Sequence, residues 1–244
     1  LMKFWTKRGV HMDSRDNVFY KLIKQIQACF GSALTLVLDR GYANITTLDV
    51  LIKHQQTFII RWKSAILLKD NQGHIKNTWR ICHGKKGFDR RVFADKERKM
   101  TVRLEIIYAP VWHPTYEAEN NKQPFTLVVI RNKSIKGQQP MYLLTNQLVD
   151  SIGMAWAIFK SYIQRWDIEQ AFRFNKAEIG IQSIRVHALE TRLKILAVIM
   201  LIYDFLLQLR RNHTHVSNSI IKKWCPRTDN RLNTVRLPLY RLRL

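Results

Sequence analysis

Acidic residues, glycine and proline are scarce in this chain of 244 residues. Eighteen Asp and Glu stand against 41 Lys and Arg, which gives a formal charge of +23 at pH 7. Such an excess repels itself in a compact molecule, so it predicts a polyanionic partner, nucleic acid before an anionic membrane. Nine Gly and six Pro exclude collagen-like and low-complexity classes. A hydrophobic content of 46% excludes wholesale disorder.

Cysteine and long apolar runs are scarce as well. Cys29, Cys82 and Cys225 form no Cys-x-x-Cys pair, which argues against a zinc ribbon or a disulfide scaffold and favours a reducing cytoplasm. His213 and His215 with Cys225 offer three metal ligands and no fourth, which disfavours a zinc site. No signal-peptide pattern is present. The longest apolar stretch, 195–203, is much shorter than the ~20 residues of a membrane span, so we expect a cytoplasmic protein without membrane contact.

Hydrophobic periodicity predicts an α/β order along the chain. Apolar residues four apart predict a helix over 17–30, and the apolar run 34–38 predicts a strand covered on both faces. A second helix is expected over 46–54, and a polar loop over 83–100. Two long helices are expected over 152–176 and 188–211, the second of them buried. Strands are expected over 58–62, 78–82, 101–108, 125–130 and 141–145.

This order is simplest to explain as an α/β core interrupted by a β-rich insertion, because inserted segments enter a fold at its loops. We expect a partial core over residues 1–56 and the insertion over 57–140. A core strand with two helices follows over 141–211, and a basic segment over 212–244.

Asp39 occupies a position suited to chemistry. It directly follows the apolar strand, and the carboxyl end of such a strand faces the crevice where open α/β sheets bind ligands. The alternative is a turn-forming Asp before Gly41.

Glu169 lies in the middle of the first long helix. At about 100° per residue, an arc of about 80° holds this acid together with Tyr162, Arg165, Arg173 and Lys176. One reading of the stripe is a surface face with i,i+4 ion pairs. The other is a stripe that holds a metal-binding carboxylate and clamps phosphates.

The spacing Tyr162, two residues, Arg165, three residues, Glu169, six residues, Lys176 resembles a signature of the insertion sequence four family of DDE transposases. The segment 39–42 after the apolar strand resembles the family segment that holds the second catalytic Asp. Residues 141–146 resemble the strand that precedes the signature helix, and the β-rich insertion matches that of some members in position. The resemblance runs from about residue 17 to about residue 211.

The resemblance implies an RNase H-like, retroviral integrase-like mixed sheet with flanking helices. It also implies three carboxylates that hold two divalent cations, Mg²⁺ or alternatively Mn²⁺, for phosphoryl transfer at DNA. Asp39 corresponds to the second acid and Glu169 to the third, both as catalytic metal ligands. The DNA-backbone contacts are Tyr162, Arg165 and Lys176, to which the helix geometry adds Arg173. The implied partners are the double-stranded DNA of transposon ends and target, and a second copy in a homodimer on that DNA.

A counterpart of the family's first catalytic Asp is missing. Asp13 and Asp16 are the only acids before Asp39, and both lie in a polar stretch with no strand around them. We therefore expect the chain to be truncated at its N-terminus, beyond the first acid and the opening strands of the sheet. By itself it is expected to be inactive.

Two other functions compete with a transposase catalytic domain. A non-catalytic DNA-binding remnant would use the same basic faces, and the missing first acid favours it. A basic RNA-binding or ribosome-associated protein leaves the four-residue spacing unexplained. Within the insertion, Trp62, Trp79 and Trp112 either belong to the core or stack on a base.

Overall fold

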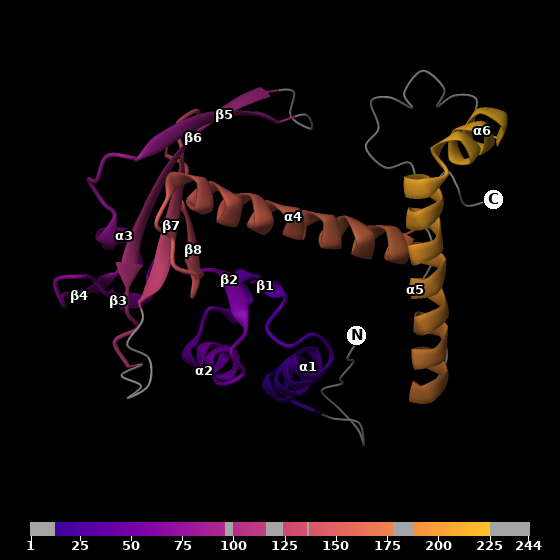
Figure 1. Cartoon of the computed structure of the whole chain (residues 1–244), viewed down its shortest axis with the longest axis horizontal. Coiled ribbons are helices and arrows are strands. Elements are labelled where there is room, and N and C mark those ends of the chain that lie inside the picture. The colour runs from indigo at the N-terminus through magenta and orange to yellow at the C-terminus, as the bar shows by residue number, and fades with distance from the viewer. Residues whose placement is uncertain (1–12, 96–99, 116–123, 136, 178–187, 225–244) are drawn as a thin grey trace. The chain divides into compact units, whose positions relative to one another are not determined.

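The computed structural model describes residues 13–95, 100–115, 124–135, 137–177 and 188–224 (Figure 1). The chain divides into two compact units, with the boundary after Ile163. In the described residues, the first unit contains a mixed sheet with helices against it, and the second unit contains helices. The predicted α/β class, a mixed sheet with flanking helices, is confirmed.

One six-stranded sheet forms the frame of the first unit, in the order β1-β2-β8-β7-β6-β5 (Figure 1). β1 and β2 run parallel, with Leu38 opposite Ile60, and all other neighbours are antiparallel. Parallel strands need a crossover, which α2 (Ile45–Lys53) supplies. The strands are β1 (Thr35–Leu38), β2 (Thr57–Arg61), β5 (Asp89–Asp95), β6 (Met100–Val111), β7 (Phe125–Asn132) and β8 (Met141–Thr145).

The sheet separates two hydrophobic cores, because successive side chains of a strand point to opposite faces. Ile60 of β2 packs in the core that contains residues of α1 (Arg15–Phe30) and α2. Its neighbour Ile59 packs in the other core, with Trp156 and further residues from the start of α4 (Ile152–Ala177). The predicted boundaries at residues 56, 140 and 211 stay a prediction. Apart from β3 (Leu67–Lys69) and β4 (Ile75–Asn77), the strands of residues 57–140 belong to the same sheet as β1 and β8.

Capping residues set the ends of the first two helices. Ser14 Oγ accepts a hydrogen bond from the Asn17 backbone N–H at 3.1 Å, and Asn44 Oδ1 accepts one from the Thr47 N–H at 2.9 Å. Gly31 ends α1 with a φ of 57°, a left-handed conformation that glycine adopts without a steric penalty.

The strand predicted over 78–82 is wrong, because α3 (Thr78–Ile81) is a single helical turn there. It follows a two-stranded hairpin of β3 (Leu67–Lys69) and β4 (Ile75–Asn77). The backbone N–H groups of Thr78 and Trp79 donate to carbonyl groups of residues 66 and 64. The backbone of this segment therefore bonds to a nearby loop and not to a neighbouring strand, although its side chains are of types that favour strands.

The polar loop predicted over 83–100 contains a strand. β5 pairs with β6 along its whole length, from Asp89 opposite Ile106 to Asp95 opposite Met100. Its apolar residue Phe93 packs against Trp156 of α4, with ring centroids 5.4 Å apart. The neighbouring arginines hid this edge strand from a hydrophobicity pattern.

β1 differs from the predicted strand covered on both faces. In the described part of the chain it pairs with β2 alone and lies at one edge of the sheet. Thr35 is exposed and the three residues after it are only half-buried. A strand with one neighbour leaves half of its backbone groups unpaired in the sheet, a known route to edge-to-edge association.

The helices of the second unit are α5 (Leu189–Asn212) and α6 (Thr214–Trp224). The prediction of a buried helix over 188–211 differs from the structure. Of the α5 side chains that the structure describes, Ile199 and Leu206 are buried, whereas Leu201 is 69% exposed. α6 contacts α5 within this unit. Because α6 is short and α5 is apolar nearly all round, α6 covers only part of the apolar surface of α5. No helix in the described residues is long and apolar enough to cross a membrane.

Candidate active site

Asp39 lies at the carboxyl end of β1, where the chain turns into the 3₁₀ helix Arg40–Tyr42. Its carbonyl accepts the hydrogen bond of the Tyr42 N–H at 3.0 Å, and its side chain makes no capping hydrogen bond to the turn. The Tyr42 ring packs against Phe19 at a centroid distance of 5.0 Å, which holds the turn on α1. Backbone and aromatic contacts therefore maintain the turn, and the exposed carboxylate of Asp39 is not used for it.

Glu169 forms an ion pair within α4. Arg165 Nη1 donates to Glu169 Oε1 at 2.6 Å, the i,i+4 contact that the helical spacing predicts. The Arg165 side chain is 16% exposed and that of Glu169 is 35% exposed. A partly exposed carboxylate in such a pair keeps access to solvent, so the ion pair and a metal ligand are compatible roles for Glu169.

The other residues of the stripe differ along the helix. Tyr162 is buried, with 4% of its surface exposed, in the core between α4 and the sheet. Arg173 and Lys176 lie on α4, but their side chains fall outside the part that the structure describes. The roles of Tyr162, Arg165, Arg173 and Lys176 in DNA contact stay predictions.

The structure brings Arg165 and Glu169 together, and it places Asp39 in a different unit. Asp39 belongs to residues 1–163, whereas Glu169 belongs to residues 164–244. A metal site shared by these two carboxylates therefore stays a prediction as well.

The three tryptophans considered for base stacking differ in exposure. Trp62 is buried in the core of the α1–α2 face, and Trp112 is half-buried. Trp79 of α3 is 37% exposed, and the Arg80 guanidinium lies 5.2 Å from the centre of its ring. Of the three, Trp79 therefore has the surface that a ligand needs.

Sequence reasoning missed Glu105, which is 2% exposed in the middle of β6. Its carboxylate lies 3.0 Å from Arg90, 3.4 Å from Arg131 and 3.2 Å from Lys133. Burial raises the pKa of a carboxyl, but hydrogen bonds and charges from Arg90 and Lys133 hold the pKa of Glu105 below its usual value. An acid between two apolar residues in the predicted strand 101–108 was the available signal.

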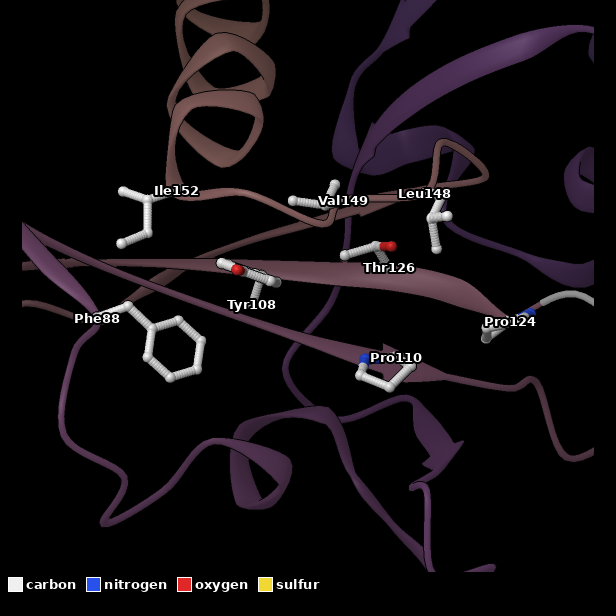
Figure 2. A pocket seen from close by; sticks show the side chains of 8 residues that line it. All are labelled: Phe88, Tyr108, Pro110, Pro124, Thr126, Leu148, Val149 and Ile152. Carbon is white, nitrogen blue, oxygen red and sulfur yellow. The ribbon is translucent and has the colours of Figure 1, made fainter.

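A pocket of about 400 Å³ lies on the α4 face of the sheet (Figure 2). Figure 2 shows Phe88, Tyr108 and Pro110 on one side of it and Leu148, Val149 and Ile152 on the other. Pro124 and Thr126 complete a lining without a carboxylate. The pocket thus offers no carboxylate ligand to a cation.

In the described residues, no group of three or more His, Cys, Asp or Glu side chains lies close enough together to hold a metal ion. The acids upstream of Asp39 have local partners. Asp13 accepts a hydrogen bond from Lys21 at 2.7 Å, and Asp16 lies 3.5 Å from Arg15. His213 and His215 lie at the junction of α5 and α6, and Cys225 falls outside the described residues.

The chain was also compared with known protein families and with curated proteins. The model of the transposase DDE domain matches residues 14–205, which span both Asp39 and Glu169. Among curated proteins, none matches the chain in sequence.

Proposed function

The chain belongs to the transposase DDE domain family, and from that premise we propose that it is the catalytic domain of a protein that cuts and joins DNA at transposon ends by metal-dependent phosphoryl transfer. Asp39 carries the proposal. Its exposed carboxylate directly follows a strand of the mixed sheet and is not used by the turn that it begins. Open α/β sheets bind their ligands at this end of the strands.

Asp39 and Glu169 would be the ligands of the divalent cations, Mg²⁺ or Mn²⁺. Carboxylate oxygens are hard ligands of the kind that Mg²⁺ prefers, and both side chains have exposed surface. Such ions, when bound, activate a water or a 3′-hydroxyl and stabilise the leaving oxygen. Two carboxylates hold a cation more weakly than three, so we expect the chain by itself to be inactive.

Arg165 has two partners in this proposal. In the free protein it neutralises Glu169 at 2.6 Å. With DNA bound, its guanidinium would contact a backbone phosphate, together with Arg173 and Lys176 farther along α4. The buried ring of Tyr162 holds the helix on the sheet. Its hydroxyl is proposed as a further backbone contact, which requires this group to become exposed when DNA binds. Because transposition joins two element ends, we propose that a homodimer acts on the DNA.

The substitution Glu169→Gln tests the assignment. In the chain extended by its upstream coding sequence, we expect Mg²⁺-dependent cleavage of duplex DNA, which Glu169→Gln abolishes. In the 244-residue chain, the same substitution should weaken Mn²⁺ binding measured by electron paramagnetic resonance.

Glu190→Gln is the matched control. Glu190 forms the same kind of i,i+4 ion pair, with Lys194 at 2.8 Å, on a different helix. The control should keep both cleavage and Mn²⁺ affinity. If the extended Glu169→Gln protein still cuts DNA, Glu169 is not a metal ligand of the reaction.

A non-catalytic DNA-binding protein is the second candidate, favoured by the lack of a three-acid group among the described side chains. The two candidates differ in one result. A binding protein retains salt-sensitive DNA affinity, but its extended form does not cut DNA with Mg²⁺ or Mn²⁺.

A further inference from the structure

Three neighbouring strands carry a row of charges on the face opposite α4. Arg90 of β5 lies opposite Glu105 of β6, and Glu105 lies opposite Arg131 of β7. Lys133, just after β7, places its Nζ 3.2 Å from the same carboxylate. Three cations thus surround one anion, and the cluster has two positive charges in excess.

Arg131 fastens a basic loop, residues 83–88, to this cluster. Its Nη1 donates to the carbonyl of Lys85 at 2.7 Å, and its Nη2 donates to the carbonyl of Cys82. Gly87 permits the close approach, because a Cβ there would lie 2.0 Å from Cγ of Glu105. The exposed side chains of Lys85 and Lys86 are therefore held beside the charge row.

A pocket of about 400 Å³ opens between this loop and the sheet. Arg131 and Lys133 contribute the cations of its lining, and Trp79 contributes an aromatic wall. The Arg131 side chain is 19% exposed and that of Lys133 is 48% exposed, so both reach the surface. His83 stands edge-on to Trp79, with ring centroids 5.3 Å apart.

We propose that this pocket binds a backbone phosphate of DNA, with Arg131 and Lys133 as its cations and Trp79 against the adjoining deoxyribose. Paired cations next to an apolar ring match an anion that is attached to a sugar. Lys85 and Lys86 extend the positive surface beyond one phosphate, which suits a strand rather than a single nucleotide. This DNA contact rests on the proposed function and adds to it a site formed by residues other than Asp39 and Glu169.

Lysine acetylation in the unmodified protein tests the contact. The rate at which an amine-reactive ester acetylates Lys133 is measured by mass spectrometry with duplex DNA, with inorganic phosphate at equal ionic strength, and with neither. Lys24, exposed on α1, is the internal control. We expect DNA to slow acetylation of Lys133 more than that of Lys24. Equal slowing of both lysines, or protection by inorganic phosphate but not by DNA, would overturn the proposal.

The variant Lys133→Gln gives an independent measurement. Arg90 and Arg131 still pair with Glu105 in this variant, so the charge row keeps its salt bridges. We expect the log–log slope of DNA affinity against salt to fall by about 0.9, the contribution of one phosphate contact. Lys24→Gln removes the same charge and should leave the slope unchanged. Equal slopes in the two variants contradict this site, whereas failure of the extended chain to cut DNA contradicts the proposed function alone.

Discussion

The carboxylate of Glu169 has two roles, an ion pair with Arg165 and the proposed metal ligand. The i,i+4 pair with Arg165 is one of the weak contacts of a helix surface, worth about 0.3–0.5 kcal/mol in general. A divalent cation competes readily with an interaction of that size. The ion pair therefore holds the carboxylate of Glu169 in position without preventing the role proposed for it. At Asp39, likewise, the turn relies on backbone contacts and leaves the carboxylate available.

Of the glycines that the structure describes, Gly87 is the one where an added methyl group meets the closest contact. In Gly87→Ala the added Cβ meets Cγ of Glu105, a side chain held by three cations and unable to give way. We expect the free energy of unfolding to fall by about 1–3 kcal/mol, measured by urea denaturation. Gly153→Ala is the control, since the nearest atom lies 4.0 Å away and alanine favours a helix. A Gly87→Ala protein as stable as the parent would show that the loop does not lie on Glu105.

The lowered pKa of Asp70 predicts how the stability of the fold depends on pH. The hydrogen bond from Lys76 lowers the pKa of Asp70 most, burial opposes it, and the N–H groups of His74 and Gln72 assist, so that the pKa falls from 3.8 to about 2. Because the pKa of Asp70 is lower in the folded state than in the unfolded state, the ionised carboxylate stabilises the fold. This stabilisation is fully present above the unfolded-state pKa and is lost as the pH falls through the folded-state pKa.

The substitution Asp70→Asn should lower the melting temperature near neutral pH. Between about pH 4 and pH 2 the parent protein should lose this advantage, so that the two melting curves converge. A difference in melting temperature that stays constant over this range would contradict the assigned pKa.

The secondary-structure elements show what a hydrophobic pattern reveals and what it hides. Strands β1, β2, β6, β7 and β8 and helices α1, α2, α4 and α5 lie where periodicity predicted them, to within a few residues. α3 was hidden because its fold depends on hydrogen bonds to a loop some twelve residues upstream. β5 was hidden by its arginines. The candidate residues Asp39 and Glu169 were found from local spacing, which contains no information on how two units are placed.

The contact between β5 and α4 can be tested through one hydrogen bond, from Trp156 to Asp89. The indole N–H of Trp156 donates to Asp89 at 2.8 Å, and this bond, ahead of Arg91, lowers the pKa of Asp89. In Trp156→Phe the ring still packs on Phe93, but the donor is gone. We expect the pKa of Asp89, followed by NMR, to rise toward 3.8. Trp112→Phe is the control, and a pKa of Asp89 that is the same in both variants would show that Trp156 is not its donor.

At the scale of the whole molecule, we expect the formal charge of +23 to govern how the protein interacts with DNA phosphates. Several of the few acids already have cation partners in the structure, among them Asp70, Asp89 and Glu105. Because Lys and Arg outnumber Asp and Glu by 41 to 18, a large positive charge stays available to phosphates however such pairs form. DNA affinity should therefore fall steeply with salt, with a log–log slope of about 0.9 per phosphate contact, measured by fluorescence anisotropy. An affinity that does not change with salt would show that the positive charge does not drive DNA binding.

We propose that Asp39 and Glu169 hold the same cation. Iron-directed cleavage tests it, because Fe²⁺ bound in place of Mg²⁺ generates radicals that cut the backbone beside the ion. With ascorbate and peroxide, we expect cuts next to both Asp39 and Glu169, suppressed by Mg²⁺ and lost at both positions in Asp39→Asn. Cuts beside one of the two acids only, or a loss confined to the substituted segment, would contradict a shared site.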